Sequence, residues 1–308
     1  MDLYQKIIIE SRKVNEFWES KNDDDFEFVK INFGKYTLTI EKKFDYKSFP
    51  PDSFFIVDKN LHLDLDHKVF MELEASESKT KNIDFINSLV TKYSESFKGR
   101  VLVAVGGGVV LDTVLCIGKI LNLKVIFVPT TILSMSDSSI GSKARANKIS
   151  IVNGQEVFLK HFYREFYDPT QIIICENFLK TIPDSAILFS CAEIIKMALF
   201  QSDPLLDFLL SKDFEPFKNK KSLLKAILWA TDLKRICMEV DPKETANGAK
   251  LIIREGHAFA DKLEKESGFK VSHGEAVLRG IANDLEQTDR SKTFMRLCTK
   301  LKINHPIL

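Results

Sequence analysis

Residues 101–112 read Val-Leu-Val-Ala-Val-Gly-Gly-Gly-Val-Val-Leu-Asp, and this stretch decides the fold. The apolar run 101–105 predicts a buried strand, and the helical spacing of 109–121 predicts a helix after it. Between them, Gly106, Gly107 and Gly108 let backbone N–H groups approach a pyrophosphate at a helix N-terminus. The spacing is not that of the standard Rossmann fingerprint, G-x-G-x-x-G. A tight turn without a ligand therefore remains an alternative at this point.

Similar patterns lie on both sides of this stretch. Apolar runs alternating with helical segments favour a parallel sheet covered by helices. The predicted strands are 54–57, 68–72, 125–128 and 171–175, and a further helix is expected at 82–97. Alternating runs at 28–33 and 36–40, joined by Gly34-Lys35, predict a hairpin.

Beyond Asp168-Pro169 the strand signals fade and helical spacing dominates. We expect helices at 186–200, 204–210, 222–240, 249–265 and 275–285. The fold class is therefore an α/β domain with a parallel sheet followed by an all-α domain. We assign 1–25 to an N-terminal helical extension ending in an acidic run, 26–170 to the α/β domain and 171–308 to the helical domain.

Composition excludes several classes of protein. The 308 residues include 44 Lys and Arg against 43 Asp and Glu, so a net charge of +1 offers no field for nucleic acid or a membrane surface. No apolar run approaches the ~18 residues of a membrane span, and we see no signal peptide. Five scattered cysteines within apolar runs indicate buried thiols in a reducing cytoplasm.

Three residues in the second half form a candidate metal site: Glu193, His257 and His273. One carboxylate and two imidazoles are the ligands of a catalytic zinc site that keeps an open position. Each lies beside a small residue (Ala192, Gly256 or Gly274) that allows close approach of a metal or of backbone. Taken singly, the glutamate suits a solvated helix and each histidine suits a satisfied core or surface position. From the residues alone, both interpretations remain open.

Further polar residues suit a cofactor and an anionic substrate. Asp58 and Thr130-Thr131 end predicted strands, at the sheet edge where α/β proteins bind ligands. Several cations lie in the loop after Asp137 or on the predicted helices near the candidate ligands. They suit a phosphorylated or carboxylated substrate, and the alternatives are surface turns, a solvated face or, for Lys196, an ion pair with Glu193. These cations are Lys143, Lys196, Lys234, Lys250 and Arg254.

The chain resembles 3-dehydroquinate synthase and the wider sugar phosphate cyclases from about Lys30 to about Leu285. Several motif segments occur in the family's order, which makes the resemblance specific. These segments are Gly106 to Asp112, Pro129 to Lys143, Phe178 to Pro183, Ala192 to Lys196, Gly256 to Phe259 and His273 to Val277.

The resemblance implies an NAD⁺-binding α/β domain and a helical domain that binds Zn²⁺ or Co²⁺ through Glu193, His257 and His273. In this family NAD⁺ transiently oxidises a secondary alcohol, phosphate is eliminated, the hydride returns and an aldol step closes a carbocycle. It also implies a cytoplasmic homodimer that acts on a small phosphorylated sugar. The implied NAD⁺ contacts are Asp58, Asn60, Lys79, Gly106, Gly107, Gly108, Asp112, Thr130, Thr131, Lys143, Phe178 and Thr181. The implied substrate contacts are Asp137, Lys143, Lys196 and Lys234. We add Lys250 and Arg254 to the candidate catalytic residues because they place positive charge near the candidate ligands.

The chain also departs from the family pattern. Asp261 replaces a histidine, and Arg254 stands where a polar amide is expected; the two could pair across seven residues. The arginine that reaches a neighbouring subunit's substrate is absent around 122–124, residues 144–164 differ, and the C-terminal segment is shorter by roughly a few tens of residues on the domain-size scale.

We therefore expect a substrate other than the usual seven-carbon keto-acid phosphate. Two alternatives stay open. One is an NAD-dependent, metal-containing polyol dehydrogenase that releases NADH, although such enzymes usually begin their ligand set with Asp. The other is a non-catalytic paralogue of the synthase that keeps the fold and loses turnover.

Overall fold

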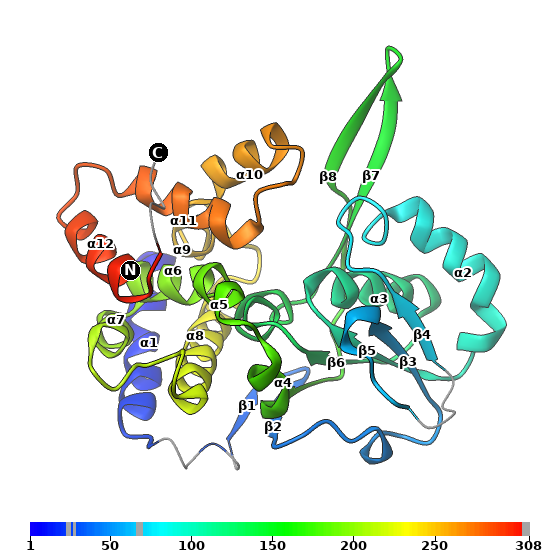
Figure 1. The fold of residues 1–308 in the computed structure, drawn as a ribbon, viewed down its shortest axis with the longest axis horizontal. Coiled ribbons are helices and arrows are strands. Elements are labelled where there is room, and N and C mark those ends of the chain that lie inside the picture. Colours follow the sequence, from blue (N-terminus) through cyan, green and yellow to red (C-terminus); the bar gives the residue numbers. More distant parts are fainter. Residues whose placement is uncertain (23–25, 27–28, 66–69, 304–308) are drawn as a thin grey trace. The chain divides into compact units, whose positions relative to one another are not determined.

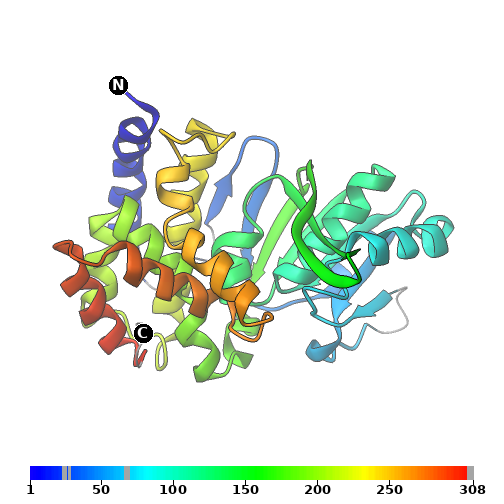
Figure 2. The same cartoon turned by 90° about the horizontal axis from the view of Figure 1, so that it is seen from above.

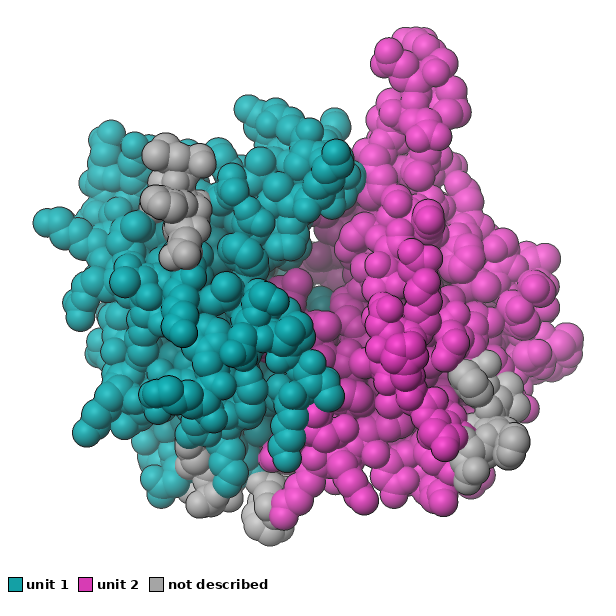
Figure 3. Space-filling view, viewed as in Figure 1, with its two compact units in different colours: residues 1–26, 135–140, 179–308 teal, residues 27–134, 141–178 magenta. Residues whose placement is uncertain are grey.

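The computed structural model describes residues 1–22, 26, 29–65 and 70–303. The chain forms two compact units (Figure 3). The helical unit comprises Met1–Phe26, Met135–Ile140 and Leu179–Leu308, and the α/β unit comprises Glu27–Ser134 and Gly141–Phe178. Each unit is described separately below.

Within the described residues, the α/β unit has a seven-stranded sheet with the order β1-β2-β9-β6-β5-β3-β4. All neighbouring strands are parallel except β1 and β2, which form the predicted antiparallel hairpin. The strand order reverses beside β3, because β4 lies on one side of it and the next strand, β5, on the other. The strands are β1 (Lys30–Asn32), β2 (Thr37–Glu41), β3 (Ser53–Asp58), β4 (Phe70–Leu73), β5 (Val101–Gly106), β6 (Val125–Pro129) and β9 (Gln171–Cys175).

The central strands are buried almost throughout, as their continuous apolar runs predict. The predicted strands at 54–57, 101–105, 125–128 and 171–175 are confirmed, while Lys68 and Val69 of the expected strand 68–72 lie outside the described residues. Helix α2 (Ile83–Phe97) begins after Asn82, whose side chain accepts a hydrogen bond from the Asp84 N–H. Helix α3 (Gly108–Leu121) packs on β5 and β6.

A long hairpin that the sequence analysis did not predict projects from this unit (Figure 1). Strands β7 (Lys143–Val152) and β8 (Gln155–Phe166) join through Asn153 and Gly154, both with positive φ. A register shift at Asn147 interrupts the pairing. The strands escaped prediction because their apolar residues alternate weakly and many side chains are exposed.

In the helical unit the long helix α8 contacts α1, α6 and α7, while α11 packs on α5, α6 and α10 (Figures 1 and 2). Its helices are α1 (Leu3–Glu19), α5 (Asp184–Ser190), α6 (Ala192–Gln201), α7 (Asp203–Leu210), α8 (Lys220–Val240), α9 (Lys250–Ile253), α10 (His257–Glu266), α11 (His273–Asp284) and α12 (Arg290–Lys300). The short helix α4 (Glu176–Thr181) contains the division between the units.

The structure changes the expected domain boundaries. Helix α1 is part of the helical unit rather than an extension, because buried indole N–H groups join it to α8: Trp18 donates to Asp232, and Trp229 donates to Asn15. Strand β9 pairs with β2 and β6, so the α/β unit continues to Phe178 instead of ending at 170. The acidic residues 23–25 lie outside the described part of the chain.

Two expected helices are interrupted. The segment predicted at 186–200 breaks at Cys191 into α5 and α6, and the one predicted at 249–265 breaks into α9 and α10. At the second break Gly256 has φ 76°, a left-handed conformation that ends the helical path. All five cysteines are buried and none forms a disulfide, as expected. None of the described helices is both long and apolar enough to span a membrane.

Candidate functional site

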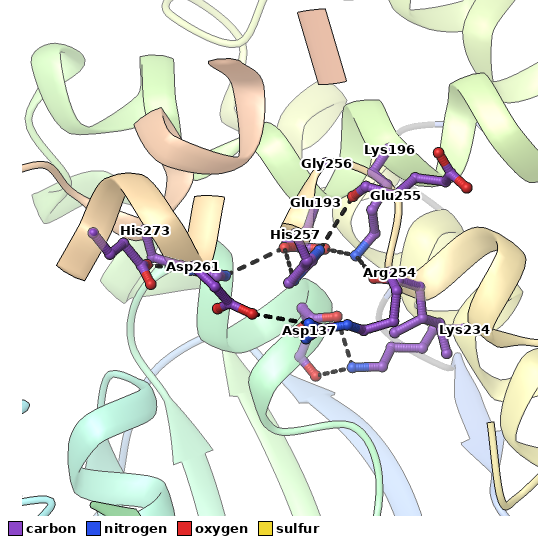
Figure 4. A network of polar contacts seen from close by, with 12 residues as sticks. Asp137, Glu193, Lys196, Lys234, Arg254, Glu255, Gly256, His257, Asp261 and His273 are labelled. Carbon is purple, nitrogen blue, oxygen red and sulfur yellow. Dashed lines mark hydrogen bonds and ion pairs between the residues drawn. The ribbon is translucent and has the colours of Figure 1, made fainter. Parts of the chain in front are cut away.

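The structure brings Glu193, His257 and His273 together in the helical unit. One ligand atom from each lies within 4.8 Å of the others. Glu193 Oε1 is 3.7 Å from His257 Nε2 and 3.5 Å from His273 Nε2. Glu193 lies in the first turn of α6, and the two histidines begin α10 and α11 (Figure 4).

The small residues beside the ligands serve packing between helices. A Cβ on Gly274 would lie 2.0 Å from the Phe189 carbonyl oxygen, so only glycine lets α11 start against α5. At Gly256, the N–H donates to Asp284 Oδ2 at 2.7 Å. These glycines were expected to admit a metal or backbone, and in this structure it is backbone that approaches.

The two imidazoles are oriented by partners on their far nitrogens. His257 Nδ1 lies 3.1 Å from the Glu255 carbonyl oxygen, and His273 Nδ1 lies 2.7 Å from Glu264 Oε1. In the metal-binding form, protons on the Nδ1 atoms would leave both Nε2 lone pairs facing the Glu193 side, as in histidines that bind metals through Nε2. Glu193 Oε1 is buried and accepts no hydrogen bond from the described residues. Such an orphaned acceptor, with two imidazole nitrogens beside it, fits a divalent cation.

Charge governs the protonation of this cluster. Burial alone would raise the pKa of Glu193, but the Lys196 ammonium and the two imidazoles hold it well below its usual range. Burial, then Lys196, lowers the pKa of His257 to about 4. Burial opposes protonation of His273 as well, yet the neighbouring carboxylates of Glu193 and Glu264 raise its pKa to about 9.

Two lysines among the implied substrate contacts form buried ion pairs. Lys196 pairs with Glu193 and donates to the Ile253 carbonyl oxygen at 2.8 Å. Lys234 Nζ lies 2.6 Å from Asp137 Oδ1 and 2.7 Å from the Asp137 carbonyl oxygen. Burial would raise the pKa of Asp137, and Lys234 lowers it below the usual value.

The Arg254–Asp261 pair also forms, with Arg254 Nη2 2.8 Å from Asp261 Oδ2 (Figure 4). The pair does not lie along one helix as the seven-residue separation suggested. Arg254 follows the last residue of α9, and Asp261 lies inside α10 beyond the break at Gly256. Lys250, the remaining candidate, is exposed at the start of α9.

In the α/β unit the glycine turn joins β5 to α3. Gly107 caps the helix without any side-chain hydrogen bond, and the first helical bond runs from the Leu111 N–H to the Gly107 carbonyl oxygen at 3.1 Å. The preceding N–H groups therefore have no intrahelical partner. A Cβ on Gly107 would lie 3.2 Å from Thr131 Cγ2, so a side chain at this position would crowd the turn. This cradle fits a pyrophosphate.

The other predicted edge residues lie at the carboxyl ends of β3 and β6. Asp58 accepts hydrogen bonds from the Asn60 N–H and side-chain amide, both at 3.0 Å. The Thr130 N–H donates to the Gly106 carbonyl oxygen, and Thr131 Oγ1 contacts Ser134 Oγ at 2.9 Å. The glycine turn and Asp58 end β5 and β3, the strands beside which the order reverses, where open α/β sheets bind ligands.

The remaining predicted cofactor contacts differ in burial, in their partners and in the unit to which they belong. Asp112 pairs with Lys81 Nζ at 2.6 Å, whereas Lys79, two residues earlier, is exposed. Phe178 is buried against Phe44, and Thr181 falls in the helical unit. Lys143 begins β7 in the α/β unit.

Sequence reasoning missed three residues at these sites: Lys81, Glu255 and Glu264. Glu255 directly precedes the Gly-His motif, which was a signal for it. Lys81 and Glu264 look like ordinary surface charges in the sequence, and only their burial marks them.

Two family models match in succession. The model described as 3-dehydroquinate synthase N-terminal matches residues 70–188, and the one described as 3-dehydroquinate synthase C-terminal matches residues 190–302. A curated 3-dehydroquinate synthase from Saccharolobus solfataricus is 30% identical over 230 residues, which are 73% of this chain and 62% of that protein. The chain thus spans less than two thirds of that relative's length.

Solved structures share the fold. ValA (2-epi-5-epi-valiolone synthase) from Streptomyces hygroscopicus subsp. jinggangensis 5008, with NAD⁺ and Zn²⁺ bound, superposes with a TM-score of 0.71 at 17% identity, covering 89% of this chain and 82% of that one. A 2-deoxy-scyllo-inosose synthase complexed with carbaglucose-6-phosphate, NAD⁺ and Co²⁺ gives 0.70 at 18% identity, covering 91% and 84%. These neighbours agree with the expected α/β and helical fold class.

Proposed function

The chain belongs to the 3-dehydroquinate synthase family, which confirms the resemblance seen in its motifs, and from this premise we propose its activity. We propose that it is a sugar phosphate cyclase-like lyase that eliminates phosphate from a phosphorylated keto-sugar and closes a carbocycle. Its cofactors are NAD⁺ and one divalent cation, Zn²⁺ or Co²⁺.

The convergence of Glu193, His257 and His273 is the observation that carries this proposal. Both histidines have their Nδ1 atoms engaged, and Glu193 Oε1 has no hydrogen-bond partner among the described residues. These three side chains would hold the cation and leave a position open, as catalytic zinc sites do. When bound, the cation would lower the pKa of a substrate hydroxyl and NAD⁺ would accept a hydride from its carbon.

Neighbouring side chains then have definite tasks. Lys196 keeps the buried Glu193 ionised. Lys234 keeps Asp137 ionised. The Asp137 carboxylate can then accept a hydrogen bond from a substrate hydroxyl. Glu255 and Glu264 fix the two imidazole rings.

In the α/β unit, the N–H groups at the start of α3 would receive the pyrophosphate of NAD⁺. Asp58, with Asn60 beside it, offers a carboxylate to ribose hydroxyls at the neighbouring strand end. Lys81 neutralises the buried Asp112 of α3, so we assign Lys81 the task of holding that carboxylate in position. The homodimer and the cytoplasmic location stay predictions.

The test combines metal analysis with product detection. Protein purified without chelator should contain or take up about one Zn²⁺ per chain, the number that one such ligand set holds. With NAD⁺ and a panel of hexose and heptulose phosphates, we expect inorganic phosphate without net NADH. No Zn²⁺ uptake would contradict the metal site. Stoichiometric NADH release would identify a polyol dehydrogenase, and ligand binding without phosphate release would identify a non-catalytic paralogue.

A further inference from the structure

The cations of the candidate catalytic centre in the helical unit are neutralised by carboxylates, with one exception. Lys196 pairs with Glu193, Lys234 with Asp137, Arg254 with Asp261, and His273 contacts Glu264. An anionic substrate group could use these cations only by displacing a carboxylate that already holds them. Electrostatic pairing of this kind discriminates against a second anion at the same place.

The Arg254–Asp261 pair lies on both sides of His257 along the chain. The Arg254 carbonyl oxygen accepts the His257 N–H at 3.0 Å, and Asp261 follows His257 by four residues on α10. Residues four apart share one face of a helix, so Asp261 extends from the face that carries His257. The side chains of the pair are 42% and 36% exposed, and a bound ligand can therefore reach them.

Lys250 is the exception. It is exposed, and among the described residues it has no ion-pair partner. Its carbonyl oxygen accepts the Arg254 N–H at 3.1 Å, so it lies one helical turn before Arg254. An unpaired ammonium suits a phosphate group, which a point charge attracts without a fixed geometry.

We infer that the Arg254–Asp261 pair determines substrate class, selecting a phosphorylated sugar whose chain is neutral and polyhydroxylated over one that carries a carboxylate. Asp261 repels a substrate carboxylate and occupies the guanidinium that would otherwise bind it. Hydroxyl groups can both donate to Asp261 and accept from Arg254, so a neutral chain matches the intact pair. Lys250 takes the phosphate. This inference rests on the proposed function and specifies its substrate.

Two ligands that differ at one carbon test it. Sorbitol 6-phosphate and gluconate 6-phosphate share the phosphate and hydroxyl groups but end in a neutral CH₂OH or a carboxylate. Calorimetric titration of the NAD⁺-loaded and Zn²⁺-loaded protein should show sorbitol 6-phosphate binding about tenfold tighter or more. In Asp261→Asn the ratio of the two dissociation constants should fall by about tenfold, through tighter binding of gluconate 6-phosphate.

The control variants separate this effect from general damage. Arg254→Met combined with Asp261→Asn should remove the gain, because the gain requires the guanidinium. Lys250→Ala should weaken both ligands equally and leave their ratio unchanged. Lys262→Ala/Glu266→Gln removes an exposed ion pair on the same helix and should change neither ligand. Thermal melting of each variant would establish that it is folded.

Three results would overturn the inference: gluconate 6-phosphate binding the parent protein as tightly as sorbitol 6-phosphate, an unchanged ratio in Asp261→Asn, or no binding of either ligand. The titrations are repeated without Zn²⁺ so that the ratio can be read even if the metal site fails. Failure of the proposed function would appear separately, as absent Zn²⁺ uptake or absent phosphate release. If the ratio of dissociation constants shifted in Asp261→Asn but the protein released no phosphate, the inference on substrate selectivity would stand and the proposed lyase activity would be rejected.

Discussion

The candidate site of the α/β unit consists of backbone groups, whereas that of the helical unit consists of side chains. In the α/β unit the glycine turn is backbone from one continuous stretch, residues 101–112, placed at a strand end. In the helical unit the Glu193–His257–His273 cluster consists of side chains from the starts of three helices. A backbone site responds mainly to added volume, whereas a side-chain site responds to the loss of individual atoms or protons.

Removing one ligand should have the largest effect. His257→Ala should lower Zn²⁺ affinity by more than about 100-fold, the upper range for losing an outer partner of a ligand. Competition with a chromogenic chelator would measure it, with His62→Ala as a matched control outside the cluster. If both variants bound Zn²⁺ with equal affinity, His257 would not be a ligand and the side-chain site would not depend on its individual atoms.

Protons provide the second test of the side-chain site. His273, with a pKa of about 9, is protonated at neutral pH and must lose a proton to bind a cation, whereas His257, with a pKa of about 4, is already neutral. Zn²⁺ affinity should therefore rise with pH, about tenfold per unit between roughly pH 6 and 8. Calorimetry in buffers of different ionisation enthalpy should show release of one proton. A pH-independent affinity would contradict this picture of His273.

An isosteric change one step farther from the cation should be milder. Glu264→Gln keeps the size of the side chain but removes the charge that orients His273 at 2.7 Å. We expect Zn²⁺ affinity to fall by about 10- to 100-fold. Glu266→Gln, on the exposed side of the same helix, is the control. If both variants bound Zn²⁺ like the parent, Glu264 would have no role in holding the ring.

The backbone site should respond to volume. Gly107→Ala places a Cβ 3.2 Å from Thr131 Cγ2 and inside the cradle, so NAD⁺ affinity should fall by about tenfold. Thr131→Ser removes that methyl group, and the double variant shows whether crowding by Thr131 alone is responsible. Tight NAD⁺ binding by Gly107→Ala would show that the pyrophosphate does not lie on this turn.

The same contrast explains which predictions succeeded. Residues 101–105 could be assigned to a strand from the sequence alone because a buried parallel strand needs a continuous apolar run. The hairpin of β7 and β8 could not, because its exposed strands carry no such run. The break between α9 and α10 was also missed, since helical spacing continues through Gly256 and only its left-handed φ of 76° ends the helix.

The sequence by itself determined the order of the buried strands, the glycine turn and the identity of the candidate ligands. Tertiary structure alone decided that Lys81 pairs with Asp112, and that Glu264 supports His273. It also decided that Arg254 and Asp261 meet across a helix break instead of along one helix. The physical reason is the sequence separation over which each interaction acts. Hydrophobic periodicity and backbone freedom act between near neighbours, while ion pairs and metal sites depend on distances set by packing among remote segments.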